Sequence, residues 1–204
     1  MLANMPQEVR LALFVAKLNC PYCDDTQRLL EEIADLSEKV KLEVHPRYED
    51  EILEAALGIE RVPALAILGA DGTDYGIRYY GIPAGYEFGS LINDIVMVGR
   101  KESGLSDATR NALAGIGEEV HIQVFVTPTC PYCPSAVHLA HAMALESEHV
   151  HADMIEAQEF PDLAQRYNVY GVPKSVINET IRIEGAVAEE QFLEKVLEAV
   201  EKTG

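Results

Sequence analysis

The chain has 204 residues, 48% hydrophobic and 25% charged, a composition typical of soluble globular proteins with room for one large or two small domains. Its net charge of −18 disfavours contact with a phosphate backbone, so we expect no nucleic-acid partner. The apolar run Leu11 to Ala16 is far shorter than the roughly 18 residues of a membrane span and lacks the shape of a signal peptide. We therefore expect a cytoplasmic protein with no membrane partner.

The first half of the chain predicts the order strand, helix, strand, helix, strand, strand, helix. The apolar run at 11–16 leads into Cys20-Pro21-Tyr22-Cys23, after which a helical period of apolar residues is carried by Leu29, Leu30, Ile33 and Leu36. A strand at 40–44, a short helix at 50–57 and a hairpin of 64–68 with 77–80 follow. A closing helix carries Leu91, Ile92 and Ile95.

The second half repeats this order after a polar, glycine-bounded linker at 99–104. Ser106 caps a predicted leading helix that ends near Ile116. A strand at 122–126 leads into Cys130-Pro131-Tyr132-Cys133, and the next helix carries Val137, Ala140, Met143 and Ala144. Later elements are predicted at 150–155, 161–167, 175–177, 180–183 and 192–200. The first unit has only residues 1–7 for the matching element, so its leading helix is expected to be short or missing.

An offset of 110 residues superimposes the two halves. Cys20, Cys23 and Pro63 then coincide with Cys130, Cys133 and Pro173, and Glu43 coincides with Asp153. We predict two similar α/β units, at 1–102 and 103–204, each with a mixed central sheet flanked by helices on both faces.

The repeated CxxC motif, which uses all four cysteines, indicates dithiol chemistry. A helix N-terminus stabilises a sulfur anion, and the i, i+3 spacing brings both sulfurs of a motif to that end. We predict that Cys20 and Cys130 are the nucleophiles and that Cys23 and Cys133 resolve the mixed disulfide. Pro21 and Pro131 suit a first helical turn, and Tyr22 and Tyr132 are expected at the contact surface, where recognition of substrate and plain exposure remain equal alternatives.

The two motifs have different neighbours. Asp24 and Asp25 follow Cys23, and their negative charges disfavour a thiolate on Cys20. Pro134 and Ser135 follow Cys133 instead. Lys174 follows Pro173 where Ala64 follows Pro63, although Lys17 near Cys20 acts in the opposite sense. We predict a lower pKa for the Cys130 thiol and more reductase activity at that site.

Glu43 and Asp153 are candidate proton relays for the resolving thiols, because a buried carboxyl with a raised pKa can accept a proton near neutral pH. The alternative is a strand-end carboxylate that reaches solvent, and it is the favoured interpretation.

The CPYC-helix and the Val-Pro pair 40 residues later resemble thioredoxin and glutaredoxin folds. The tandem arrangement, with Phe125 to Cys133 and Tyr80 to Phe88, resembles the protein disulfide oxidoreductases of thermophilic archaea and bacteria. The resemblance covers nearly the whole chain. It implies cis peptide bonds at Val62-Pro63 and Val172-Pro173, whose backbone pairs with an extended substrate. It also implies reduction, formation or isomerisation of protein disulfides in redox homeostasis, with electrons from NADPH through a thioredoxin reductase and no bound cofactor or metal. We expect a monomer, with an oligomer possible.

Three alternatives stay open. A zinc site built from all four cysteines is disfavoured, because Cys23 and Cys130 are 107 residues apart where zinc ribbons separate their pairs by about 15–20. CPYC also occurs in glutathione-dependent glutaredoxins, but Asn19 and Thr129 stand where that family often has a basic residue. An electron donor to a peroxidase system would use the same chemistry as a protein disulfide oxidoreductase.

Overall fold

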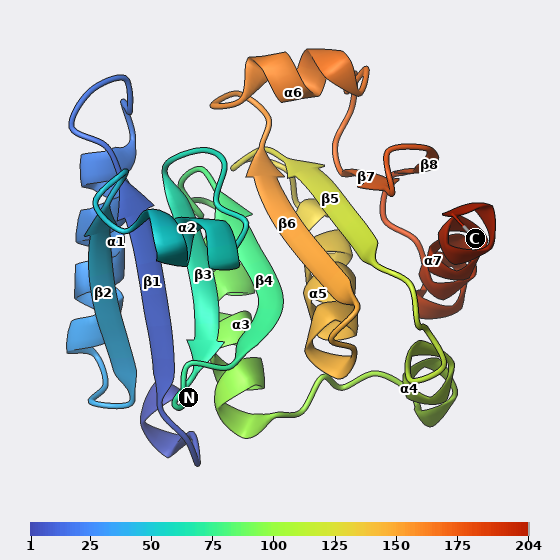
Figure 1. Ribbon diagram of the computed structural model, residues 1–204, viewed down its shortest axis with the longest axis horizontal. Coiled ribbons are helices and arrows are strands. Elements are labelled where there is room, and N and C mark those ends of the chain that lie inside the picture. The colour runs from blue at the N-terminus through green and yellow to red at the C-terminus, as the bar shows by residue number, and fades with distance from the viewer. Residues whose placement is uncertain (204) are drawn as a thin grey trace.

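The computed structural model describes residues 1–203 and contains one mixed eight-stranded sheet with helices on both faces (Figure 1). The strand order is β2-β1-β3-β4-β6-β5-β7-β8. The strands are β1 Val9–Val15, β2 Val40–Pro46, β3 Ala64–Gly69, β4 Asp74–Tyr80, β5 Val120–Val126, β6 Val150–Glu156, β7 Lys174–Ile177 and β8 Ile181–Glu184. The helices are η1 Leu2–Asn4, α1 Cys23–Asp35, α2 Glu51–Ala56, α3 Glu87–Arg100, α4 Asp107–Leu113, α5 Cys133–Glu146, α6 Pro161–Arg166 and α7 Glu189–Thr203.

The two halves of the chain share this sheet through one parallel pairing. Strand β4 of the first half pairs with β6 of the second, in a register that aligns Ile77 with Ala152 and Tyr80 with Ile155. Strands β1 to β4 lie on one side of this junction, and β5 to β8 lie on the other. Because the junction pairs backbone to backbone, elements of one half are held beside the CPYC turn of the other half.

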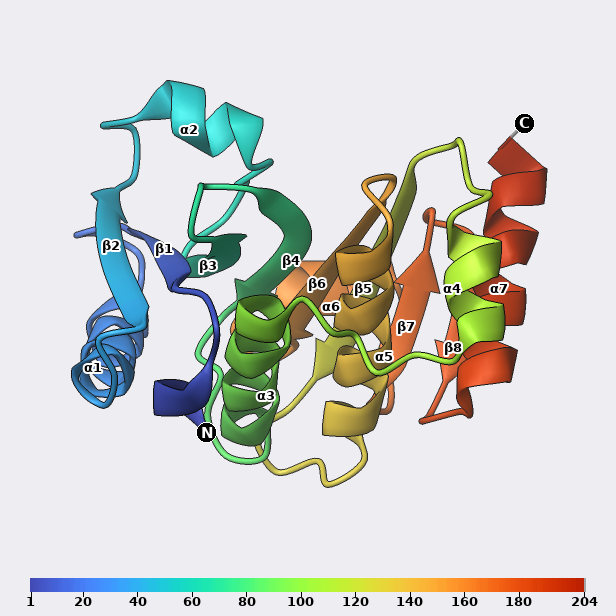
Figure 2. The same ribbon diagram turned by 90° about the horizontal axis from the view of Figure 1, so that it is seen from below.

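Helices cover the two faces of the sheet unequally. The larger core packs α1, α3, α4, α5 and α7 against one face, through side chains such as Leu30, Leu91 and Val137 (Figure 2). The smaller core packs the segments of α2 and α6 against the other face, through Leu57 and Leu163. Alternation along β1 makes this division visible, since Leu11 and Leu13 join the larger core whereas Ala12 and Phe14 join the smaller one.

The predicted fold class is confirmed, and one detail of the predicted packing is wrong. Leu30 and Ile33 of α1 are buried, but Leu36 is 69% exposed because it caps the C-terminal end of the helix, beyond the face that meets the sheet. Ser106 caps α4 as predicted, accepting a hydrogen bond from the backbone of Thr109 at 3.2 Å. The matching element of the first half is the three-residue helix η1. The unit boundary after residue 102 falls between α3 and α4 and stays a prediction.

The loop before α3 makes a close contact with the other half, next to its CPYC turn. Gly85 has a φ of +61°, and a Cβ at this position would overlap the carbonyl oxygen of Pro128. The next residue, Tyr86, donates its backbone N–H to that same carbonyl at 3.0 Å. Glycine at 85 therefore allows α3 to begin directly against the segment that leads into Cys130.

This contact predicts that Gly85→Ala destabilises the protein more than an alanine at a comparable glycine does. Gly104 is the matched control, because it has a φ of +75° but open space around its Cβ position. We expect Gly104→Ala to lower the free energy of unfolding by about 1 kcal/mol, the cost of left-handed backbone. Gly85→Ala should cost roughly 1–3 kcal/mol more, because of the overlap with Pro128. Urea unfolding of the two variants measures the difference, and equal losses would contradict the proposed tight fit.

Candidate functional site

The N-terminal dithiol lies in the turn between β1 and α1. Cys20 and Cys23 form a disulfide with a Cα–Cα distance of 5.4 Å, and α1 begins at Cys23. Cys23 is 2% exposed, and its sulfur accepts a hydrogen bond from the Ala16 backbone at 3.3 Å, whereas Cys20 is partly exposed. The more accessible sulfur is thus that of Cys20, which suits attack on a substrate, and the buried one is placed to resolve.

The C-terminal dithiol has the same layout but a tighter setting. Cys130 and Cys133 form a disulfide with a Cα–Cα distance of 5.5 Å at the start of α5. The backbone N–H of Cys133 donates to the Cys130 sulfur at 3.1 Å. Cys130 is only 7% exposed, less than expected for a solvent-facing nucleophile, because the segment before it is covered by the start of α3. Tyr132 beside it is 70% exposed, and Tyr22 of the other motif is 44% exposed.

A Val-Pro pair directly precedes β3 in the first half and β7 in the second. The Val62-Pro63 and Val172-Pro173 peptide bonds are both cis. Among the described residues, the backbone N–H and C=O groups of Val62 and Val172 make no hydrogen bond with the protein. Both groups remain available to an added strand, the way in which an extended peptide binds a sheet edge.

The N-terminal dithiol opens onto a cleft of about 640 Å³ that both halves of the chain line. The first half supplies Pro21, Tyr22, Pro63 and neighbouring residues, and the second half supplies residues 158–162. An ion pair of 2.8 Å between Arg61 and Asp162 joins the two walls. The cleft has the size of a binding site for a small molecule or for a few residues of a peptide.

The charges around the dithiols differ from the sequence expectation in one respect. The sequence predicts that Lys174 favours the Cys130 thiolate, but its Nζ bonds to Glu184 at 2.8 Å and to the carbonyl of Asn168 at 2.9 Å. Its charge is therefore already compensated. Asp25 is neutralised by Arg28, so Asp24 supplies the remaining unpaired negative charge in the first turn of α1.

The two predicted proton relays lie away from the dithiols. Register places Glu43 beside Ala12 and Asp153 beside Gln123, on the face of the sheet that α2 and α6 cover, opposite to α1 and α5. The hydrogen bonds and charge of Arg10, at 2.8 and 2.9 Å, lower the pKa of Glu43, the opposite of the raised pKa that a relay needs. Asp153 is buried and bonds to His121 at 2.6 Å. Burial lowers the pKa of His121, but the bond and charge of Asp153 outweigh it and raise that pKa.

The structure buries a different carboxyl in α3, the helix that starts against the segment leading into Cys130. Glu87 is 1% exposed in the first turn of α3, and burial raises its pKa to about 7. One carboxylate oxygen accepts a hydrogen bond from Ser90 at 2.7 Å, and the other has no partner. Its helix starts against Pro128 and packs beside α5 (Figure 2). Sequence reasoning missed Glu87 because nothing in a local pattern reveals that α3 docks on the other half.

A second such carboxyl lies in the cleft of the N-terminal dithiol. Glu159 belongs to the second half, lines the cleft together with Pro63 and Tyr22, and accepts a hydrogen bond from the Ile82 backbone at 2.7 Å. Its other oxygen is buried without a partner. Burial, reinforced by the charge of Glu156, raises its pKa to about 7. Two carboxyls thus have a pKa raised to about 7: Glu159 in the cleft beside Pro21 and Tyr22, and Glu87 in the helix that starts against Pro128.

A buried polar cluster lies deeper between α3 and α5. Asp94 bonds both to the Tyr79 hydroxyl and to Nδ1 of His141, the latter at 2.5 Å, and all three side chains are fully buried. Burial and the charge of Asp94 raise the pKa of Tyr79 well above its ordinary value. The cluster joins β4 and α3 of the first half to α5 of the second.

Metal ligation is a poorer fit to these residues than dithiol exchange. The four sulfurs are paired at two separate helix starts, not gathered at one point. Within residues 1–203, no group of three or more His, Cys, Asp and Glu side chains is arranged to hold a metal ion. In the same range, no helix has the length and apolar character required to cross a bilayer.

Comparison with known proteins finds similar sequences and structures among thioredoxin-type proteins. The model of the thioredoxin domain matches residues 120–198. The crystal structure of a protein disulfide oxidoreductase from Aeropyrum pernix K1 has a TM-score of 0.92 and 38% identity, covering 98% of this chain and 89% of that one. The N-terminal domain of alkyl hydroperoxide reductase AhpF from Enterococcus faecalis has a TM-score of 0.89 and 28% identity, covering 94% of this chain and 92% of that domain structure.

Curated relatives are longer than this chain. The AhpF protein of the alkyl hydroperoxide reductase of Pseudomonas aeruginosa is 24% identical over 200 residues, which are 93% of this chain and 36% of that protein. An NADH dehydrogenase of Ferdinandcohnia aciditolerans is 24% identical over 181 residues, 89% of this chain and 32% of that protein. The chain thus spans about a third of the length of these relatives.

The surroundings of the two dithiols lead us to predict different pKa values for the Cys20 and Cys130 thiols. Cys130 accepts a backbone hydrogen bond that stabilises its thiolate, whereas the first turn of α1, next to Cys20, carries the negative charge of Asp24. We expect the Cys130 thiol to have the lower pKa despite its greater burial. Thiolate absorbance of the reduced Cys20→Ser and Cys130→Ser variants measures it, and Asp24→Asn should lower the Cys20 pKa. A Cys20 pKa at or below that of Cys130 would refute the ordering.

Proposed function

This chain belongs to the protein disulfide oxidoreductase family, and we propose that it reduces protein disulfides through both of its CPYC sites in the service of cellular redox homeostasis. Dithiol-disulfide exchange is its chemistry. The observation that carries the proposal is that each half has a CPYC disulfide at a helix start and a cis Val-Pro pair whose valine backbone is unpaired among the described residues. Formation and isomerisation of disulfides use the same steps in other directions.

The reaction proceeds in two exchanges at each site. The thiolate of Cys20 or Cys130 attacks one sulfur of the substrate disulfide, forming a mixed disulfide and releasing the other substrate sulfur as a thiolate, which takes up a proton. Cys23 or Cys133 then gives up its proton and attacks the mixed disulfide. The CPYC disulfide forms, the second substrate thiol leaves, and two electrons have passed to the substrate.

The resolving thiols need a proton acceptor, and we assign this role to Glu159 at the N-terminal site and Glu87 at the C-terminal site. Both carboxyls have one buried oxygen without a partner and a pKa raised to about 7 by burial. A base with such a pKa is ionised for much of the time at neutral pH and still accepts a proton readily. This pair replaces Glu43 and Asp153 as candidate relays.

Electrons are proposed to come from NADPH through a thioredoxin reductase, with the protein acting in the cytoplasm as a monomer. A reduced CPYC pair must be regenerated after each turnover, and a thioredoxin-like dithiol is the kind of acceptor that such a reductase recognises. The protein partners are then disulfide-bearing substrates on one side and the reductase on the other. Glutathione with glutathione reductase is the competing supply.

Electron donation to a peroxidase is a second candidate function. It is favoured by likeness to the AhpF protein of alkyl hydroperoxide reductase, which extends over 93% of this chain at 24% identity in Pseudomonas aeruginosa. Here the substrate disulfide would belong to a peroxidase, and the exchange chemistry would be unchanged. The same reduced protein, offered insulin or a peroxidase in its disulfide form, distinguishes the two by relative rate.

We predict that either CPYC site alone supports insulin reduction coupled to NADPH oxidation. The activity should be lost when both sites are removed. The double variant Cys20→Ser/Cys23→Ser reports the C-terminal site, and Cys130→Ser/Cys133→Ser reports the N-terminal site. The C-terminal site should carry the larger share of the activity. Arms with thioredoxin reductase and with glutathione plus glutathione reductase identify the donor. Full activity in the variant that lacks all four cysteines would refute the function.

We further predict that the two glutamates act on opposite sites. The rate of mixed-disulfide resolution in each single-site protein should rise as the pH passes through about 7, because the ionised carboxyl is the base. Glu159→Gln should remove this dependence and slow resolution roughly 100-fold at the N-terminal site only, and Glu87→Gln should do so at the C-terminal site only.

Glu87→Gln measured at the N-terminal site and Glu159→Gln measured at the C-terminal site are the matched controls for folding and for non-specific effects. Asp162→Asn, an exposed acid on the wall of the same cleft, should leave the pH dependence of resolution intact. Equal losses at both sites from either glutamate variant would point to a purely structural role.

A further inference from the structure

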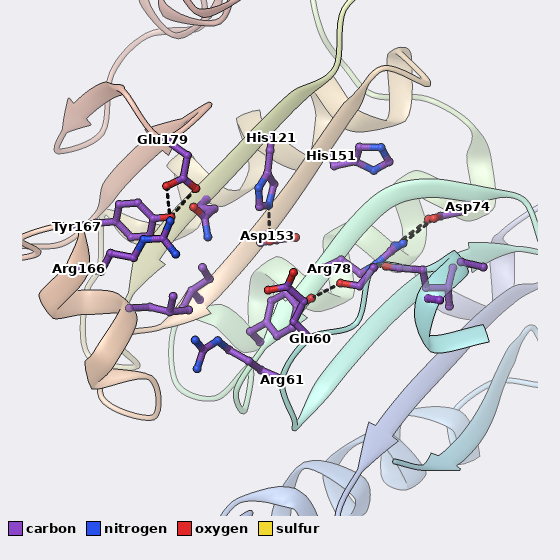
Figure 3. Close-up of a pocket in the computed structure, with 18 residues that line it drawn as sticks. Glu60, Arg61, Asp74, Arg78, His121, His151, Asp153, Arg166, Tyr167 and Glu179 are labelled. Carbon is purple, nitrogen blue, oxygen red and sulfur yellow. Dashed lines mark hydrogen bonds and ion pairs between the residues drawn. The ribbon is translucent and has the colours of Figure 1, made fainter. Parts of the chain in front are cut away.

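A pocket of about 560 Å³ lies between the two halves, on the face of the sheet that carries α2 and α6 (Figure 3). Strands β4, β5 and β6 form its floor, α2 supplies Ala55 and Ala56 on one side, and α6 supplies Leu163 and Arg166 on the other. Neither cysteine pair lines it. The dithiol chemistry described above does not use it.

The pocket adjoins the cleft of the N-terminal dithiol. Glu60 and Arg61 line both cavities, and Val62, with its unpaired backbone, follows them directly. An extended segment that pairs with Val62 and runs along residues 60–62 therefore leaves the dithiol and arrives at the pocket. At about 3.3 Å per residue, a few residues of an extended chain cover this path.

Most of the charges that line the pocket are already paired; the exception among the described residues is Glu60, whose exposed side chain has no ion-pair partner. Arg78 bonds to both carboxylate oxygens of Asp74, at 2.8 and 2.5 Å. On the rim, Arg166 pairs with Glu179 at 2.9 Å, and His121 pairs with Asp153 at 2.6 Å (Figure 3). A charged group that entered would have to compete with these partners, so the pocket favours an uncharged occupant.

The floor nevertheless offers an unused hydrogen-bonding group. Gln123 is 7% exposed and lines the pocket, and within residues 1–203 its side-chain amide has no hydrogen-bond partner. The amide atoms are not sealed from solvent, so they can bond to water or to a group that enters the pocket. Around it lie apolar surfaces that include Ile155, Leu163 and the ring of Tyr80. The matching chemistry is an apolar body with a hydrogen-bonding tip, as in a tyrosine side chain.

We propose that this pocket is an anchor site for the protein substrate of the N-terminal dithiol: it takes a large uncharged side chain, tyrosine-like, from the same extended segment whose cysteine reacts with Cys20. The proposal rests on the proposed function, since it deepens substrate recognition at that site. The C-terminal site lacks the connecting residues, because Tyr170 and Gly171 stand at the positions equivalent to Glu60 and Arg61.

The test uses an N-terminal-site trap with the substitutions Cys23→Ser, Cys130→Ser and Cys133→Ser. The probes are glycine- and serine-rich peptides with one cysteine, blocked as a disulfide with a coloured aromatic thiol. Attack by Cys20 joins the peptide to the protein and releases the coloured thiolate, so absorbance gives the second-order rate constant. A single tyrosine is moved from five residues before the cysteine to five residues after it.

We expect at least one tyrosine position to react tenfold faster than the peptide without tyrosine, and lysine or glutamate at that position to give no gain. Ala55→Trp fills the pocket from an exposed position on α2 and should abolish the gain without slowing the peptide that lacks tyrosine. Ile52→Trp is the matched control, because Ile52 is 86% exposed on the same helix and does not line the pocket. Gln123→Met should reduce the preference for tyrosine over phenylalanine.

The outcomes separate the two levels of the proposal. Absence of a gain at every tyrosine position, or loss of the gain in Ile52→Trp as well, overturns the anchor site while the dithiol function stands. Failure of the trap to react with any peptide, in a protein that remains folded, overturns the proposed function at this site.

Discussion

The parallel pairing of β4 with β6 is the constraint on which the rest of the molecule depends. It turns two half-sheets into one and fixes the halves at the register that aligns Tyr80 with Ile155. The loops that follow these two strands therefore meet at the C-terminal ends of the strands, where Ile82 of the first half contacts Glu159 of the second. Because backbone hydrogen bonds hold the junction, the contribution of each half to the other's site is part of the fold itself.

This arrangement makes two identical tetrapeptides chemically different. Both motifs start a helix, and both share the dipole and free N–H groups that favour a thiolate. Beyond the motif, Cys130 is enclosed by the start of α3, whereas Cys20 is partly exposed and its neighbours Pro21 and Tyr22 line a cleft with walls from both halves. Burial, hydrogen bonding and access thus differ where the residues that perform the exchange are the same. A chain with two such sites can address substrates of different shape with one chemistry.

Sequence patterns are sufficient for much of the fold. The period of Val137, Ala140, Met143 and Ala144 places α5 correctly because all four side chains face the larger core. Strand position alone leaves Glu43 open between a proton relay and a strand-end carboxylate that reaches solvent. The ion pair with Arg10, which no local pattern reveals, lowers the pKa of Glu43 and favours the second interpretation. Glu87 and Glu159 escape notice for a related reason: a glutamate at a helix start or in a loop normally reaches solvent, and only packing against the other half buries these two.

The amino-acid sequence by itself determined the chemistry, the repeat and the class of fold, since these depend on local spacing: cysteines three residues apart, a helical period after each pair, and a proline at the same distance in both halves. Tertiary structure alone decided which strands join the halves, which carboxyls are withdrawn from solvent, and that a pocket lies between α2 and α6. The physical reason is that pKa values, access and cavities arise from groups distant along the chain, whose approach depends on the sheet register and not on any local pattern.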